Sequence, residues 1–315
     1  MPAAYQSVLI NDLTNILYTA QGLLALKASN LINSQSNDCI EFSANGICAQ
    51  LGARYTELSS PKITSKSIIF NSAYKFTDQW HMGVYLDEGT ITSQPSYTYV
   101  KQTGGDPILG AYSVYQDKIV GVPYHFRLGA NIGSTSIDVS TPNIGNLGSL
   151  SRNINIKAQS YLALLSTQIP VDPKAILMPY LGTTYTTMNV DGSNNNSSKI
   201  SNIPIIFNGV STSILALQVG LNSVYRPNDS VFLAVTAGIQ HTLSSSISNM
   251  TISELPALSA YKGQSSLANN VPTFMAVAKY KTYTNQELTA KIIYRQEVYQ
   301  RIGVTSYNLN YSIGF

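Results

Sequence analysis

Large apolar or aromatic residues occupy every second position of the C-terminal stretch, Gly303–Phe315. They are Tyr307, Leu309, Tyr311, Ile313 and Phe315, and they alternate with Ser306, Asn308, Asn310, Ser312 and Gly314. Side chains of a β-strand alternate between its two faces, so this stretch predicts a strand with one apolar face and one small, polar face. A half-buried strand of a soluble β-sandwich has the same pattern.

The position of this strand favours a different class of protein. An aromatic-rich strand that ends on Phe315, the last residue, resembles the C-terminal strand of bacterial outer-membrane barrels. In those proteins the closing strand is aligned by its terminal aromatic residue. The resemblance implies a barrel whose last strand takes part in assembly, with the β-barrel assembly machinery as a partner.

The composition suits a wall that has lipid outside and water inside. Charged residues make up 11% of the chain, whereas about 25% is usual for soluble proteins. The 21 Tyr residues suit the two membrane–water interfaces of a barrel, although a soluble protein with a Tyr-rich binding face is an alternative. The net charge is only +3 and the Lys and Arg residues are scattered, so we expect no nucleic-acid partner.

No apolar run approaches the ~20 residues of a membrane-spanning helix, whereas a barrel strand needs only about 9 to 11. The N-terminus also lacks the positive region and the cleavage site of a signal peptide. If the protein is exported, we therefore expect these 315 residues to be the mature or C-terminal part of a longer precursor.

Residues 1–36 differ from the rest because their apolar residues recur at helical spacing. We expect a helix from about Ala4 to Leu31, weakened at Gly22, and long enough at roughly 40 Å to run through a barrel. A helix on the surface or against a partner is the alternative. Inside a pore, its polar residues would meet lumen groups such as Arg127, Lys157 and Arg295; these residues are Asn11, Asp12, Asn15, Thr19, Gln21 and Lys27.

From Ile47 onward the period changes to two and predicts about twelve strands. In the clearest of them, Tyr124, Phe126 and Leu128 alternate with His125, Arg127 and Asn131, which suit neither lipid nor a dry core. By the same alternation we expect the lumen to be lined by Arg127, Asn131, Lys157, Gln159, Gln218, Lys279 and Arg295. The residues expected to face lipid are Tyr124, Phe126, Leu128, Leu162, Leu217, Leu233 and Ile292.

Long and short connections alternate along these strands, and the first, before a strand that begins at Ser67, is predicted to be long. The short connections lie near Asp78, Lys118, Val171, Asn228 and Asn285. Polar stretches predict exposed loops at Glu88–Pro107 and Asp191–Lys199. Alternating loop lengths are typical of outer-membrane barrels, which have short turns on one side and long loops on the other.

A helix, about twelve strands and a terminal Phe together resemble the translocator domain of autotransporters, the type V secretion proteins. Residues 72–89, SAYKFTDQWHMGVYLDEG, are similar to an early hairpin of that family, and Ile176–Tyr185, ILMPYLGTTY, to a mid-barrel strand. The resemblance implies a pore helix with its linker in residues 1–36 and a barrel in residues 37–315. It also implies an outer-membrane location and a passenger, attached before the helix, that passes to the cell surface. The paired-Asn cleavage segment of one subgroup is not evident, so no cleavage site is carried over.

Two cysteines, Cys39 and Cys48, could close a small loop in an oxidising compartment, or remain free thiols in a reducing one. Both would lie near the oxidising periplasmic side if the helix descends through the pore and the first strand rises beside it.

Nothing in the sequence predicts catalysis, a metal or a cofactor. The three histidines have no ligands at metal spacing, and His241 near Ser244–Ser246 is only a weak candidate for catalysis at a barrel rim. The sequence therefore predicts a non-enzymatic, outer-membrane autotransporter translocator in contact with lipid. The alternatives are a channel or adhesin barrel without a passenger, and a soluble Tyr-rich β-sandwich that binds a ligand.

Overall fold

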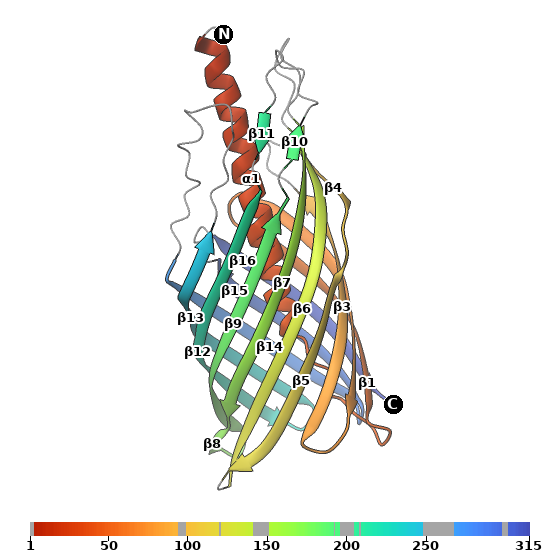
Figure 1. The fold of residues 1–315 in the computed structure, drawn as a ribbon. Helices are drawn as coiled ribbons and strands as arrows, with labels where there is room; N and C mark the ends of the chain where they lie inside the picture. Colours follow the sequence, from red (N-terminus) through yellow and green to blue (C-terminus); the bar gives the residue numbers. More distant parts are fainter. Residues whose placement is uncertain are drawn as a thin grey trace.

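The computed structural model is a barrel of antiparallel strands with a helix in its lumen (Figure 1). The residues that it describes are 3–93, 99–119, 121–140, 151–191, 193–195, 205–207, 209–247, 268–297 and 302–315. Helix α1 spans Ala3–Gln35, one turn beyond the expected end at Leu31. Within these residues, no helix combines the length and the apolar character that crossing a membrane requires.

Twelve long strands form the ring, and each pairs antiparallel with its neighbours. They are β1 (Ile47–Leu58), β2 (Ile63–Lys75), β3 (Trp80–Ser93), β5 (Ile108–Ile119), β6 (Val122–Ser140), β7 (Ser151–Thr167), β9 (Ala175–Val190), β12 (Val210–Asn228), β13 (Val231–Ile247), β14 (Asn270–Tyr283), β15 (Gln286–Gln296) and β16 (Gly303–Gly314). The ring closes where β1 pairs with β16, from Cys48 opposite Gly314 to Leu58 opposite Val304. The predicted strand number and terminal strand are confirmed.

Among the described residues, four short strands lie outside the ring, two of them in stretches that the sequence predicted as loops. In Glu88–Pro107, strand β3 continues to Ser93 and β4 (Tyr99–Gly104) pairs with the upper part of β6. Within Asp191–Lys199, β10 (Ser193–Asn195) pairs with β11 (Ile205–Phe207). The fourth, β8 (Ile169–Asp172), extends the turn before β9. Polar composition concealed the strands within Glu88–Pro107 and Asp191–Lys199, because neither face of such a strand needs to be apolar.

The first connection is short, contrary to the expectation. Strand β2 begins at Ile63 rather than Ser67, so only residues 59–62 separate it from β1. Ile63 and Ser65 are buried inside the barrel, so β2 already forms part of the wall directly after Pro61. The side chain of Tyr18 reaches this connection, with its hydroxyl 2.6 Å from Ser60 Oγ. The short turns near Asp78, Asn228 and Asn285 lie where they were predicted.

The outer face of the ring changes from apolar to polar along three neighbouring strands. On the lower part of β6 the outward residues are apolar, as at Leu128 and Ile132, and on its upper part they are polar, as at Ser134 and Asp138. The inward face changes in the opposite sense, from Asn131 to the buried pair Ile137 and Val139. Strands β7 and β9 reverse at the same height, because Ile132 lies opposite Gln159, which lies opposite Thr187.

Candidate functional site: the helix in the lumen

The C-terminal half of α1 is enclosed by the wall of the barrel (Figure 1). From Thr19 to Gln35 every residue is buried or half-buried, including Leu23 at 2% and Leu31 at 0% exposure. A helix exposes side chains in all directions, so burial around its whole circumference means that the wall surrounds it. The helix therefore fills this part of the pore.

Apolar contacts surround the helix in the upper half of the barrel. Ala20, Leu23, Leu24 and Leu26 belong to one buried cluster with inward residues of the wall, among them Leu58, Ile63, Ile137, Val139, Ile154, Ile156, Met188, Val190 and Val210. We call the residues of this cluster that are named here the collar. It explains the reversal of the wall, because strands that pack against an apolar helix must turn their apolar residues inward. The collar thus packs the helix against the wall.

Gly22 lets the helix approach the wall closely at the collar. A Cβ atom at this position would lie 2.4 Å from Pro61 Cγ, closer than side-chain atoms can pack. Gly22 therefore allows contact with the connection between β1 and β2, and the helix is continuous there.

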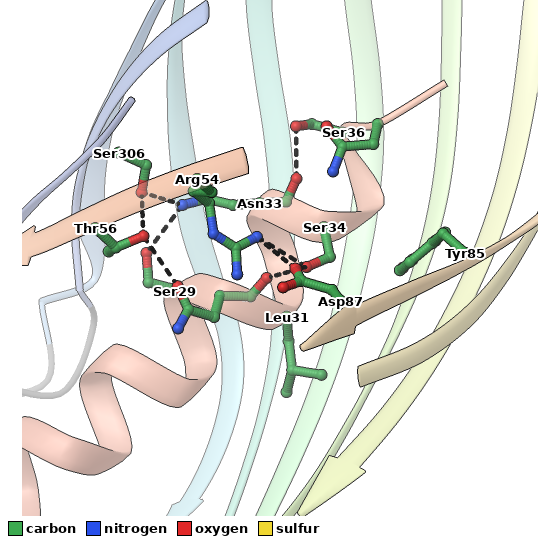
Figure 2. A network of polar contacts seen from close by, with 12 residues as sticks. Ser29, Leu31, Asn33, Ser34, Ser36, Arg54, Thr56, Tyr85, Asp87 and Ser306 are labelled. Carbon is green, nitrogen blue, oxygen red and sulfur yellow. Dashed lines mark hydrogen bonds and ion pairs between the residues drawn. The ribbon is translucent and has the colours of Figure 1, made fainter. Parts of the chain in front are cut away.

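Below the collar, a buried ion pair from the wall holds the helix. Arg54 of β1 and Asp87 of β3 are 2.7 Å apart, with side-chain exposures of 1% and 0%. Ser34 of α1 lies between them: its hydroxyl donates to Asp87 and accepts from Arg54 Nη1 at 3.0 Å (Figure 2). One helix hydroxyl thus bonds to both members of a buried ion pair, whose charges would be costly to leave unpaired.

A second buried group joins the helix to the closing strands. Asn33 Nδ2 donates to Ser306 Oγ of β16 at 2.7 Å, and Ser306 lies 3.1 Å from the hydroxyl of Thr56 on β1 (Figure 2). Thr56 in turn donates to Asn30 Oδ1 at 3.2 Å. The helix therefore bonds to both strands that close the ring.

Cations bind the C-terminal end of the helix, where carbonyl groups lack helical partners. Arg127 of β6 donates to the carbonyls of Gln35 and Asn37 at 2.7 and 3.0 Å, and Lys291 of β15 donates to that of Ser36 at 2.9 Å. Arg127 also forms an ion pair with Asp38 at 2.8 Å. Burial opposes the ionisation of Asp38, but the charge of Arg127 and a hydrogen bond from His81 outweigh it, so the pKa of this carboxyl lies below its ordinary value.

Tyrosine rings pack over glycines on the inside of the wall. The ring of Tyr112 covers Gly83, where a Cβ atom would lie 2.3 Å from its Cζ, and Tyr85 covers Gly110 in the same way. Tyr85 also accepts a hydrogen bond at 2.9 Å from Asn131, which donates to the carbonyl of Leu31 at 2.7 Å. These rings fill the space between the wall and the end of the helix.

Five of the seven residues predicted to line the lumen lie on the inward face. They are Arg127, Asn131, Gln218, Lys279 and Arg295. Lys157 and Gln159 lie on the outward face of β7, and Leu162, which was predicted to face lipid, points inward. For Lys157 and Gln159 the prediction failed because Ile154 and Ile156 of the collar take the inward positions on the upper part of β7. Leu162 lies lower on the same face and lines a cavity beside the end of the helix.

The structure places the polar residues of the helix at several levels. Asn11 is exposed and Asn15 is half-exposed, and the side chain of Asp12 lies outside the described residues. Thr19 is buried and Gln21 half-buried at the level of the collar. Lys27 donates to the carbonyl of Ser134 at 3.0 Å, not to a side chain of the lumen.

The contacts that hold the helix come instead from its last turns, at Asn30, Asn33, Ser34 and Gln35. The inward alternation of Arg54 and Asp87 was visible in the sequence, but their pairing depends on the register of three strands.

The linker after the helix contains a disulfide between Cys39 and Cys48, with Cα atoms 5.8 Å apart and both residues at 0% exposure. It joins the linker to the second residue of β1. In the terminal strand, Tyr307, Leu309 and Tyr311 are exposed outward, whereas Ser306, Asn308 and Asn310 are buried inward. The backbone N–H of Phe315 donates to the carbonyl of Ile47 at 2.9 Å, so the last residue pairs with the first of β1.

Within the described residues, no group of three side chains is suited to hold a metal ion. His241, the candidate for rim catalysis, has its Nδ1 2.7 Å from Asn270 Oδ1. Ser244, Ser245 and Ser246 follow it on β13.

No model of a known protein family and no curated protein sequence matches this chain. Solved structures of autotransporter domains do share its fold, among them the following three. The translocator domain of the autotransporter NalP from Neisseria meningitidis aligns with a TM-score of 0.66 and 13% identity over 94% of this chain and 96% of its own. The transport unit of the autotransporter AIDA-I from Escherichia coli gives 0.60 and 12% over 92% and 97%. The β-domain of the Bordetella autotransporter BrkA gives 0.58 and 13% over 87% and 100%. The chain therefore has the fold of autotransporter translocator domains, a closed barrel of twelve strands with an N-terminal helix.

Proposed function

We propose that this chain is an integral outer-membrane protein and the translocator domain of an autotransporter. It anchors a passenger attached before α1 and mediates the passage of that passenger to the cell surface. The observation that carries the proposal is the helix in the lumen: α1 runs from one mouth of the barrel into its interior and joins β1 at the other end (Figure 1). A chain attached to Ala3 would therefore emerge at the upper mouth.

The two ends of the barrel support this orientation. The upper end carries the N-terminal part of α1 and the last residues of β6, β9 and β13, whereas the C-terminus lies at the lower end (Figure 1). Outer-membrane barrels have long loops outside and short turns on the periplasmic side. The upper end is thus the cell surface.

The lower outer face supports contact with lipid. Phe70, Leu128, Leu233, Ile292 and Leu309 point outward on strands around the ring, each with at least 38% exposure. A wall of apolar residues in water would be unfavourable, and in a bilayer it is the stable arrangement. Residues 1–36 then form the pore helix and linker, and residues 37–315 the barrel, which the β-barrel assembly machinery inserts.

A surface-display experiment tests the proposed function. A signal peptide and a small epitope-tagged reporter are joined before Ala3 and expressed in a Gram-negative host, with the same reporter joined before residue 37 as a control. We expect antibodies and added protease to reach the first reporter on intact cells, and the second reporter to be exposed less often. A reporter that stays in the periplasm while the barrel is inserted would contradict a role in secretion.

A channel without a passenger is the second candidate, favoured by a cavity of about 290 Å³ beside the helix. It lies between the end of α1 and the wall, and its lining includes Leu162, Met178, Tyr180, Gln218, Met275 and Arg295. Ion conductance through the intact chain in a planar bilayer, together with failure of surface display, would favour this function.

A further inference from the structure

The disulfide between Cys39 and Cys48 lies inside the closed barrel, out of contact with solvent. Cys48 is an inward residue of β1, opposite Ala73 of β2 and Gly314 of β16 in the two strand pairs that flank it. Cys39 belongs to the linker between α1 and β1. Both cysteines have 0% exposure and share one buried cluster with Tyr112. The bond is therefore part of the interior of the barrel.

Side chains of the wall cover the linker around Cys39. The backbone N–H of Cys39 donates to the hydroxyl of Tyr112 on β5 at 3.0 Å, and Tyr112 is itself buried. Further along the linker, the ring of Phe42 packs against His81 of β3, with ring centroids 5.3 Å apart. A reagent that attacks either sulfur atom has to displace such contacts.

Disulfide exchange requires direct access to sulfur. To form the bond, one protein thiolate attacks a sulfur atom of a disulfide oxidant and releases one thiol of that oxidant. The second protein thiolate then attacks the mixed disulfide and releases the other. Two protein thiols become one disulfide, the disulfide of the oxidant becomes two thiols, and the two protons pass to the oxidant. The mixed disulfide places the oxidant itself against Cys39 or Cys48, and the packing of the closed barrel leaves no opening for it.

The bond does not need the barrel in order to form, because the loop that it closes is local. Cys39 and Cys48 are nine positions apart. The loop contains its own turn, in which the N–H of Gly46 donates to the carbonyl of Ser43 at 3.0 Å and Gly46 has a φ of 71°. A loop of about ten residues closes within about 10 to 100 ns in an unfolded chain. The two thiols therefore meet often before any strand has paired.

We propose that a disulfide-bearing oxidant joins Cys39 and Cys48 before β16 closes the ring, so the chain is a substrate of a thiol oxidase while it is still unfolded. The inference rests on the outer-membrane location in the proposed function, because the route to that membrane passes through the oxidising periplasm. Closure of the ring then protects the bond from reductants. A chain that closes with free thiols retains them, and its linker lacks the covalent tie to β1.

The reactivity of the purified full chain tests the proposal. Reduced protein is folded in detergent with dithiothreitol, separated from the reductant and exposed to oxidised glutathione, and alkylation measures the remaining thiols. We expect oxidation to be at least about 100-fold slower in the folded barrel than in the same chain in urea, because the folded chain reacts only when it opens locally. The native, oxidised barrel should resist dithiothreitol by a similar factor, a measurement that does not require the reduced chain to fold.

Matched variants move one thiol by a single residue to an exposed position. Ile40→Cys and Ile47→Cys, each in a chain with Cys39→Ser and Cys48→Ser, replace side chains that are 43% and 42% exposed. We expect both new thiols to react with dithiobis(nitrobenzoate) in the folded barrel nearly as fast as in urea. Cys48 alone, in the Cys39→Ser variant, should react at least about 100-fold more slowly in the folded barrel. Equal rates for Cys48 and for Ile47→Cys would overturn the proposal.

Pulse labelling of cells, with acid quenching and alkylation, measures the order of events. We expect the bridged chain to appear while it still migrates as unfolded protein in unheated gel samples. A folded barrel that appears first with free thiols and is bridged later would overturn the proposal, as would a purified, reduced barrel that is oxidised as fast as the unfolded chain. The measurements on purified protein involve no passenger, so their failure is distinguishable from a failure of surface display.

Discussion

At the scale of single residues, the ion pair between Arg54 and Asp87 fixes where the helix stops. The two charged side chains, at 1% and 0% exposure, lose almost all of their contact with water. The hydrogen bonds of Ser34 replace that contact only in part. Such a pair contributes little net stability compared with well-packed apolar residues, but breaking it strands a buried charge. Its role is therefore to specify the position of the helix.

Removing one partner should be much more harmful than removing both. We expect Asp87→Ala to lower the free energy of unfolding by about 3 to 5 kcal/mol, because Arg54 is left buried and unpaired. The double variant Arg54→Met with Asp87→Leu should recover most of this loss. Urea unfolding followed by the heat-dependent gel mobility of the barrel measures both. Lys157→Ala provides the control, since its exposed pair should contribute at most about 1 kcal/mol.

The packing of Tyr112 over Gly83 gives a second prediction. Gly83→Ala should destabilise the barrel by about 1 to 3 kcal/mol, because its methyl group would overlap the ring. The ring is not free to move away: its hydroxyl donates to Asn71 at 3.1 Å and accepts from the N–H of Cys39 at 3.0 Å. Gly89→Ala on the same strand has room for a methyl group, with the nearest atom at 3.5 Å, and should unfold as the parent does. Equal midpoints for the two variants would refute the packing argument.

At the scale of elements, strand β7 shows what sequence patterns can and cannot predict. Its alternation was evident, and so was its place in the ring, because period-two patterning depends only on neighbouring residues. The sequence did not predict which face of β7 points into the lumen. The helix that packs inside the barrel determines that orientation, as at Leu162 and Lys157. In β1 and β16 the polar faces do point into the lumen, so the usual pattern of a barrel strand predicts both of them correctly.

The linker after α1 gives a prediction for pH. The pKa of Asp38 is lowered in the folded protein, so its pair with Arg127 contributes stability above the ordinary value of 3.8 and loses it as the pH falls through the lower, folded value. Asp38→Asn should therefore lower the thermal midpoint near neutral pH, and the difference from the parent should shrink as the pH falls below 3.8. Thermal unfolding in detergent across this range measures the difference. A constant gap between the two proteins at every pH would contradict the assignment.

At the scale of the whole molecule, the collar makes the helix both a plug and part of the core. Deleting residues 1–34 removes the apolar partners of Ile137, Ile154 and Met188, yet leaves every strand pair of the ring intact. We expect the deleted form to fold with a lower thermal midpoint and to conduct more current per channel in a planar bilayer. Conductance no greater than that of the intact chain would mean that other groups close the pore.

The contact between β1 and β16 also has a topological meaning. The helix precedes β1 in the chain and lies inside a ring that only the last strand completes, so the ring encircles its own leading segment. Once it is closed, no sideways path leads out, and α1 can move only lengthwise. The linker at its lower end is tied to the wall through the disulfide at Cys48, so any such movement has to begin at the upper end. The helix therefore has to be inside the barrel before β16 pairs with β1, because the closed ring holds whatever it encloses.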